Sequence, residues 1–132
     1  MKIVFTLASL GSGGAERVVS LLANKMAEQG HQVEIICLKF NDVYYELHPD
    51  VKVTLAMEKT KNRLTEVFWL RKYIKQEKPD VVIAFTEGVY CFTIATHNNG
   101  SHFICPKHFG FNFFQPHQYL CMRMSISVIF SN

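Results

Sequence analysis

A glycine-rich segment near the amino terminus has the composition of a loop that binds phosphate. Gly11, Gly13 and Gly14 follow a short apolar run, and an amphipathic segment begins directly after them. Glycines let the backbone approach an anion closely, and the free N–H groups at the start of a helix attract phosphate. The same glycines would also suit a tight strand-to-helix turn that binds nothing. Position alone therefore indicates either a ligand loop or a simple turn.

Two common nucleotide-binding patterns are missing from this segment. Counted from Gly11, the third glycine of GxGxxG is replaced by Glu16, at a place where a helix normally packs closely on a strand. The next apolar run ends in Leu38, Lys39 and Phe40, without the acid that binds a ribose. The pattern GxxxxGK[ST] is also absent. These differences argue against a nicotinamide cofactor and against a P-loop nucleoside triphosphatase.

The spacing of apolar residues predicts strands that alternate with helices. Short apolar runs bounded by turn residues are typical of buried parallel strands, and a 3.6-residue period indicates a helix that covers them. This order predicts a doubly wound α/β sheet built from right-handed βαβ units. The expected strands are 2–7, 31–38, 51–57, 81–85, 102–105 and 126–130, and the expected helices are 15–29, 60–78, 88–97 and 115–124.

Two of these helices have a predicted inner face. Gly30 is placed to end the first helix in a left-handed conformation, and Pro79 ends the second. The residues expected to face the sheet are Ala15, Val18, Val19, Leu22, Ala23, Met26 and Ala27 in the first helix, and Leu64, Val67, Phe68, Leu70 and Ile74 in the second.

Composition limits the class of protein. The chain has 132 residues, enough for one domain, and 48% of them are hydrophobic, which allows a buried core. A net charge of +3 argues against a dedicated nucleic-acid-binding protein. No run of 18 apolar residues occurs, and the amino terminus lacks a signal-peptide cleavage site, so we expect a cytoplasmic protein. The four cysteines have no paired spacing and are expected to be free thiols.

The charges and histidines are unevenly distributed. No Asp or Glu follows Glu87, and the apolar stretch from 88 to 132 must pack in the domain, against a partner or against a membrane, or be foreign to the native chain. Four of the six histidines lie between His97 and His117, close to Cys105. Their spacing is irregular for a structural zinc site, so no metal is expected.

Three segments together resemble family 4 glycosyltransferases of the GT-B type. Gly13-Gly14-Ala15-Glu16-Arg17 is similar to the segment that begins the first helix of that family. Gly30, His31, Val33 and Ile35 match a second segment, and Lys78-Pro79-Asp80-Val81-Val82 matches a third. The resemblance covers about residues 1–87. It implies that the chain is a single Rossmann-like domain over 1–132, one half of a GT-B fold and incomplete at its carboxyl end.

The resemblance also implies a reaction. Such enzymes transfer a sugar from a nucleotide-sugar donor to a glycan or lipid-linked acceptor, usually with retention and without a metal. The first domain holds mainly the acceptor, while its glycine loop faces the donor diphosphate. No acid follows Glu87, so the E-x7-E motif of the second domain is not in this sequence, and we expect the donor-binding domain to be missing from this chain. This chain alone is therefore expected to be inactive. A basic bias in 58–78 allows peripheral contact with the inner face of a membrane.

The resemblance assigns roles to particular residues. Gly13, Gly14, Glu16 and Arg17 would contact the donor diphosphate or the acceptor, although Arg17 could also be a solvated surface cation. His108 follows the fifth strand, where Pro106 and Lys107 replace the family's usual small hydroxyl residue and acid. His108 would hydrogen-bond the reacting sugar or shuttle a proton, or it is a surface loop residue.

Other interpretations remain open from the sequence. Glu87 would orient an acceptor hydroxyl, or only cap the following helix. The whole chain could instead be a non-catalytic Rossmann-like module that binds an anionic ligand or a protein partner. It could also be a truncated or frame-disrupted, inactive gene product, which would account for the absence of acids after Glu87.

Overall fold

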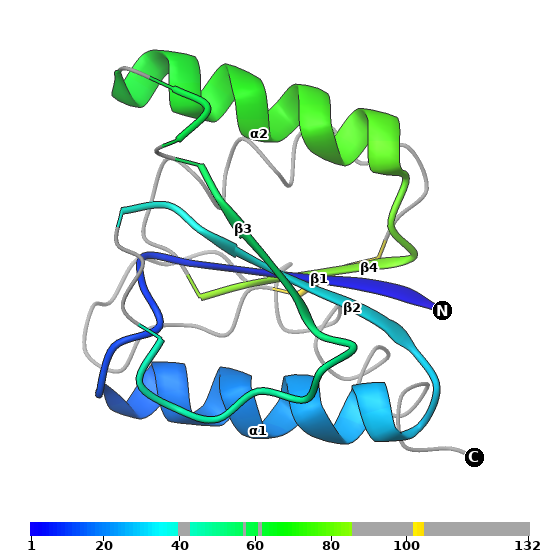
Figure 1. Ribbon diagram of the computed structural model, residues 1–132. Helices are drawn as coiled ribbons and strands as arrows, with labels where there is room; N and C mark the ends of the chain where they lie inside the picture. Colours follow the sequence, from blue (N-terminus) through cyan, green and yellow to red (C-terminus); the bar gives the residue numbers. More distant parts are fainter. Residues whose placement is uncertain (40–42, 57, 61, 86–101, 105–132) are drawn as a thin grey trace, which may run out of the picture.

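The computed structural model describes residues 1–39, 43–56, 58–60, 62–85 and 102–104. Strands and helices alternate in most of this part, as the apolar spacing predicts. Two longer helices cover a sheet of short strands (Figure 1). The elements are β1 (Lys2–Leu7), α1 (Gly14–Glu28), β2 (Gln32–Cys37), β3 (Lys52–Leu55), α2 (Arg63–Glu77), β4 (Val81–Ala84) and β5 (His102–Ile104).

The described strands form one parallel sheet in the order β3-β2-β1-β4-β5. Phe5 in the central strand β1 pairs with Ile35 on one side and with Ile83 on the other. Helices α1 and α2 cover opposite faces of the sheet (Figure 1). Parallel strands joined by helices on both faces define a doubly wound, Rossmann-like domain, which confirms the predicted fold class.

The core has two parts because alternate residues of each strand face opposite helices. Ile3, Phe5 and Leu7 of β1 pack with Val19 and the rest of the α1-side cluster. Val4 lies between them in sequence and packs on the other face with Leu70 of α2. Both β1 and β4 are buried on both faces, which accounts for their nearly continuous apolar runs.

Helix α1 ends as predicted, but one part of its predicted inner face is wrong. Gly30 has a φ of 82°, and the amides of Gly30 and His31 donate to the carbonyl oxygens of Ala27 and Met26 at 2.9 and 3.1 Å. This is the Schellman pattern that favours glycine. Ala15 and Val18 are exposed. Ser20 is buried in their place, and its hydroxyl donates to the Glu16 carbonyl oxygen at 2.9 Å.

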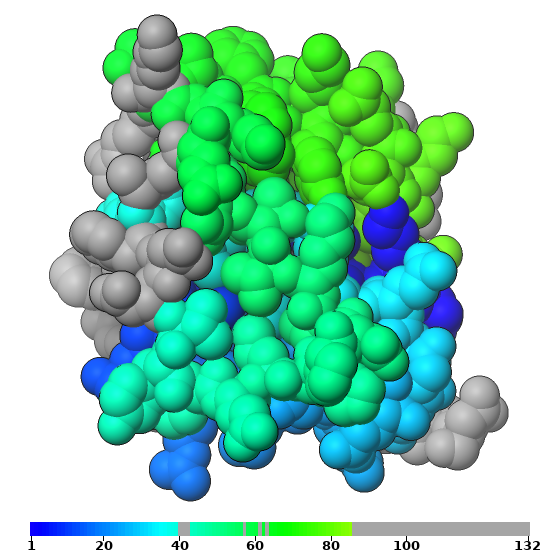
Figure 2. Space-filling view, in the orientation of Figure 1, coloured from blue at the N-terminus to red at the C-terminus, as the bar shows by residue number. Residues whose placement is uncertain are grey.

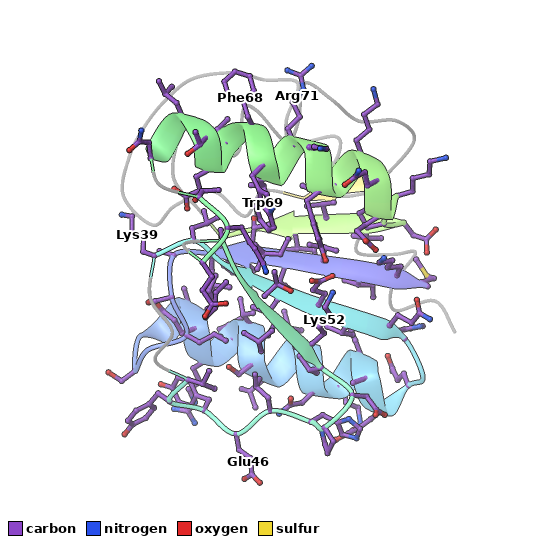
Figure 3. All side chains as sticks on the ribbon, turned by 45° about the horizontal axis from the view of Figure 1, so that its top comes forward. Lys39, Glu46, Lys52, Phe68, Trp69 and Arg71 are labelled. Atoms are coloured by element: carbon purple, nitrogen blue, oxygen red, sulfur yellow. The ribbon has the colours of Figure 1, made fainter. Side chains whose placement is uncertain are left out.

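The predicted inner face of α2 needs a larger correction. Leu70 is buried, but Leu64 and Phe68 are 75% and 65% exposed. Figure 3 shows Trp69 pointing toward the sheet, whereas Phe68 and Arg71 point away. The Trp69 and Tyr73 rings stack at 5.0 Å, and Tyr73 reaches a strand residue. This aromatic pair, rather than Leu64 and Phe68, determines which side of α2 faces the sheet.

The residue that Tyr73 reaches is Glu34 of β2, which is 4% exposed. One carboxylate oxygen of Glu34 accepts hydrogen bonds from Thr54 at 2.5 Å and Tyr73 at 2.7 Å, and Lys52 Nζ lies 3.1 Å from it. Lys52 also donates to the Tyr73 hydroxyl at 3.0 Å. We call Glu34, Lys52, Thr54 and Tyr73 the edge network, because it joins α2 to the β2–β3 edge of the sheet.

The edge network changes two acid–base equilibria. The hydrogen bond to Tyr73, together with the Glu34 charge, raises the pKa of Lys52 to about 12. Partial burial raises the pKa of Tyr73. Both groups therefore keep their protons well above neutral pH, and the network is complete under physiological conditions.

Element bounds differ slightly from the predictions. The expected strand 51–57 is Lys52–Leu55, and the expected helix 60–78 is Arg63–Glu77. The helix begins later because Asn62 and Thr65 form a capping box, with the Asn62 amide donating to Thr65 Oγ1 at 3.0 Å. The predicted helices 88–97 and 115–124 and strand 126–130 lie outside the described residues.

Among the described residues, neither helix has the length and apolar character needed to cross a bilayer.

Candidate functional site

The glycine loop, Leu10–Gly14, lies just beyond the carboxyl end of β1. Leu10 is 1% exposed and anchors the loop, while Ser12, Gly13 and Gly14 are exposed. Gly13 is the N-cap of α1, with extended backbone angles and no side-chain cap hydrogen bond. The first amides of a helix have no partner within the helix. The loop therefore presents backbone donors and the positive end of a helix dipole at the edge where doubly wound folds bind ligands.

Gly13 and Gly14 have different surroundings. A Cβ added to Gly13 would overlap the Glu16 carboxylate, whereas a Cβ added to Gly14 would meet nothing within 4 Å. Neither residue has a positive φ, so backbone strain does not require glycine at either place. The space beside Gly14 is open, which is the arrangement expected where a ligand approaches the backbone closely.

Glu16 bends back over the start of α1. As the third helical residue, it holds its carboxylate beside Gly13. A negative charge is favourable there because of the helix dipole. The carboxylate thus lies beside the position predicted for a donor diphosphate, and an anion bound there would repel it. Arg17, the next residue, is exposed, and its amide donates to the Gly13 carbonyl oxygen at 3.1 Å.

A segment between the strands expected at 31–38 and 51–57, for which no helix or strand is predicted, holds the glycine loop in place. Val43 and Leu10 form a parallel β-bridge, and the Tyr44 amide donates to the Leu10 carbonyl oxygen at 3.0 Å. The Tyr45 hydroxyl lies 3.1 Å from the Ser12 carbonyl oxygen and 3.4 Å from that of Gly13. We call Val43–His48 the strap. The sequence signal for it, two adjacent tyrosines in a polar stretch, is too general to predict these contacts.

The far end of the strap is tied to α1. Asn24 Nδ2 donates to the Glu46 carbonyl oxygen at 2.9 Å, and the His48 amide donates to Asn24 Oδ1 at 2.7 Å. Asn24 is only partly exposed, whereas the Glu46 side chain points away from the domain (Figure 3). The segment from Val43 to β3 lies on the outer surface across α1 (Figure 2). Both ends of the strap are therefore attached to the elements that carry the glycine loop.

The structure brings Gly13, Gly14, Glu16 and Arg17 together at the start of α1. The other two predicted site residues, Glu87 and His108, lie outside the described residues. Phe85, the last described residue after β4, donates its amide to the Thr6 carbonyl oxygen at 2.7 Å. The chain therefore leaves β4 beside the carboxyl end of β1, where the direction of the strand order reverses.

Within the described ranges, no group of three His, Cys, Asp or Glu side chains could hold a metal ion. Of the four histidines near Cys105, His102 lies in β5 within those ranges, whereas His97, His108 and His117 lie outside them. Cys37 is buried in β2, and its burial raises the pKa of the thiol to about 11. A thiol that stays protonated and inaccessible is not a nucleophile.

A parallel doubly wound sheet with a glycine loop entering a helix defines a Rossmann-like domain with its ligand edge at the carboxyl ends of the strands. The chain belongs to the family described as Glycosyltransferase Family 4, which matches residues 12–126. The resemblance carried by the three sequence segments is thus confirmed.

Three relatives show how the match is distributed. A Campylobacter jejuni protein is 39% identical over 101 residues, which are 69% of this chain and 28% of that protein. Its name is GalNAc-alpha-(1->4)-GalNAc-alpha-(1->3)-diNAcBac-PP-undecaprenol alpha-1,4-N-acetyl-D-galactosaminyltransferase. An uncharacterized glycosyltransferase of Haemophilus influenzae is 29% identical over 119 residues, 85% of this chain and 33% of that protein.

The third relative is the amylovoran biosynthesis glycosyltransferase AmsD of Erwinia amylovora. It is 31% identical over 77 residues, which are 58% of this chain and 21% of that protein. The chain thus spans about a third or less of the length of these relatives.

Proposed function

We propose that this chain is the acceptor-side domain of a retaining GT-B glycosyltransferase. The complete enzyme would transfer a sugar from a nucleotide-sugar donor to a lipid-linked or polysaccharide acceptor, on the cytoplasmic side of a membrane. The observation that supports this most strongly is the family match over 12–126, combined with an exposed glycine loop at the carboxyl edge of β1. A second domain, which binds the nucleotide, would close the cleft over this edge.

The proposed chemistry uses the start of α1 as the site for the diphosphate. Backbone donors at Gly13 and Gly14 would approach the leaving diphosphate, with Arg17 supplying positive charge, so that no metal is needed. In the transfer step, the bond between the anomeric carbon and the diphosphate oxygen breaks, and a bond to the acceptor oxygen forms. The acceptor hydroxyl loses its proton to the leaving diphosphate or to His108, and Glu87 orients that hydroxyl.

The class of acceptor is proposed from the named relatives. The C. jejuni relative is named for an undecaprenol-linked glycan, and the E. amylovora relative is named for amylovoran biosynthesis. Exposed Leu64 and Phe68 lie on the same helix as exposed Lys72 and Lys75. An apolar and basic outer surface of this kind supports peripheral contact with an anionic membrane, where a lipid-linked acceptor would be found.

A chimera tests this proposal. The segment of the C. jejuni relative that matches this chain would be replaced by this chain, and the product incubated with UDP-N-acetylgalactosamine and an undecaprenyl-diphosphate-linked glycan. We expect the chimera to transfer sugar and this chain alone to transfer none, with the unmodified relative as positive control. A folded chimera that binds UDP but transfers no sugar would contradict the proposal. Transfer by the 132-residue chain alone would show that the donor site is not in a separate domain.

A further inference from the structure

Tyr44 is the most exposed aromatic residue among the described positions that border the glycine loop. Its side chain is 69% exposed, yet its backbone amide is fixed to the Leu10 carbonyl oxygen at 3.0 Å. The neighbouring Val43, in the bridge with Leu10, is also exposed, at 47%. Tyr44 and Val43 thus place two adjacent exposed side chains on fixed backbone beside the candidate site, where a ligand can reach them.

Tyr45 supports the Tyr44 ring. The two ring centroids are 5.1 Å apart at an interplanar angle of 81°, an edge-to-face arrangement. Such a contact uses at most one face of each ring, so at least one face of Tyr44 has no contact with Tyr45. Tyr45 is itself held by its hydroxyl at the Ser12 carbonyl oxygen. The Tyr44 ring is therefore held at a defined place beside the glycine loop.

An aromatic face of this kind matches one chemical feature of a sugar. The face of a pyranose ring that carries several C–H groups is apolar and weakly positive, while the face of an aromatic ring is negative. The rest of the sugar remains free to hydrogen-bond water or polar groups. A tyrosine ring close to a diphosphate position would thus contact the pyranose rings of a glycan, with little selection for the identity of each sugar.

We propose that Tyr44 is a platform on which a pyranose ring of the acceptor glycan stacks, and that Tyr45 positions it. This inference rests on the proposed function, because that function places an acceptor glycan beside the donor diphosphate. It adds a binding residue outside the glycine loop, on a segment for which the sequence predicts no helix or strand.

The matched control is Phe68 on α2. It is exposed to a similar extent, 65% against 69%, but lies on the helix that covers the opposite face of the sheet. If exposed aromatic rings contacted sugars in general, replacing either residue would weaken sugar binding to the same extent. If Tyr44 is a specific platform, sugar binding should weaken when Tyr44 is replaced and not when Phe68 is replaced.

Saturation-transfer NMR on the 132-residue chain tests the platform directly. The probes are the methyl pyranosides of N-acetylgalactosamine and glucose, with the open-chain polyol mannitol as a chemical control. We expect saturation transfer to the C–H protons of one pyranose face in the wild type, in Tyr44→Phe and in Phe68→Ala. In Tyr44→Ala the signal should fall about threefold to tenfold, the range expected for one aromatic contact.

Several results would overturn the platform. The first is no saturation transfer to the pyranosides in the wild type. The second is equal saturation transfer to mannitol. The third is an unchanged signal in a Tyr44→Ala variant whose circular dichroism spectrum is native. The chimera described above separates the two proposals. If it transfers sugar with an acceptor KM that Tyr44→Ala leaves unchanged, the platform is wrong and the proposed function stands. If pyranoside binding depends on Tyr44 but a folded chimera that binds UDP is inactive, the contact between Tyr44 and a pyranose stands, its assignment to an acceptor falls, and the proposed function is wrong.

Discussion

The edge network and the glycine loop are attached to the domain in different ways. Glu34 is 4% exposed, and one of its oxygens has three side-chain partners. The glycine loop is exposed from Ser12 to Gly14, and backbone contacts and the Tyr45 hydroxyl hold it in place. The first region joins a helix to the sheet through side chains that already contact one another. The second region leaves backbone donors at the start of α1 without a side-chain cap. We therefore assign a stabilising role to the first region and propose ligand binding only for the second.

The largest expected effect comes from the edge network. Glu34→Ala removes the shared acceptor and leaves the Thr54 and Tyr73 hydroxyl groups without their partner, so we expect a loss of about 3 kcal/mol in the free energy of unfolding. Urea denaturation of the 132-residue chain measures this change. Glu46→Ala is the matched control, because Glu46 is exposed, and it should change stability by less than about 0.5 kcal/mol. Similar losses in both variants would show that the network is not a stabilising element.

The edge network also predicts a dependence on alkaline pH. Lys52 has a pKa raised from 10.5 to about 12, so its contribution is complete below 10.5 and is lost as the pH rises through about 12. The pKa of Tyr73 is raised too, so loss of its proton acts in the same direction. Because the Lys52 side chain is 63% exposed, solvent screening should limit the contribution of Lys52 to the free energy of unfolding to about 1 kcal/mol.

Tyr73→Phe isolates this effect from other alkaline titrations. The wild type should keep a constant stability advantage over Tyr73→Phe from about pH 7 to pH 9.5, and the advantage should shrink above about pH 10.5. Urea midpoints at each pH measure the difference. Parallel loss of stability in the two proteins would contradict the assignment of the raised pKa values to this contact.

Local patterns predict much of this fold, whereas contacts between distant residues do not follow from them. The strands β1 and β4 and the end of α1 at Gly30 depend on residues near in sequence. The orientation of α2 depends on a hydrogen bond between Tyr73 and Glu34, which are 39 residues apart. Apolar spacing alone therefore assigned Leu64 and Phe68 to the wrong face.

The candidate site shows the same limit. Glycine spacing predicts a loop at the carboxyl end of β1, and the structure has it there. The strap contact between Tyr45 and Ser12 spans 33 residues and could not be predicted from either local sequence. Roles for Glu87 and His108 stay predictions, because both lie outside the described residues.

Gly14→Ala separates stability from ligand binding in the glycine loop. Because an added Cβ would meet nothing within 4 Å and α1 begins at this residue, alanine should stabilise the fold by about 0.5 kcal/mol. The same methyl group would occupy the space through which a diphosphate approaches the backbone. We therefore expect higher stability and lower affinity for UDP-N-acetylgalactosamine in the chimera. Unchanged donor affinity would support the interpretation of the glycines as a simple turn.

The smallest expected change in stability comes from Glu16→Gln. Its carboxylate interacts favourably with the start of α1, so neutralising it should cost about 0.3 kcal/mol of stability. Glutamine has nearly the same size but does not repel an anion. We therefore expect the affinity of the Glu16→Gln chain for pyrophosphate, measured by calorimetry at low ionic strength, to be about twofold to threefold higher than that of the wild-type chain. Glu28→Gln at the other end of α1 is the control, since it removes the same charge away from the loop. An equal rise in both variants would indicate a general charge effect, whereas a fall in Glu16→Gln alone would mean that Glu16 helps to bind the ligand. A rise confined to Glu16→Gln would show that this carboxylate competes for the position that the diphosphate takes.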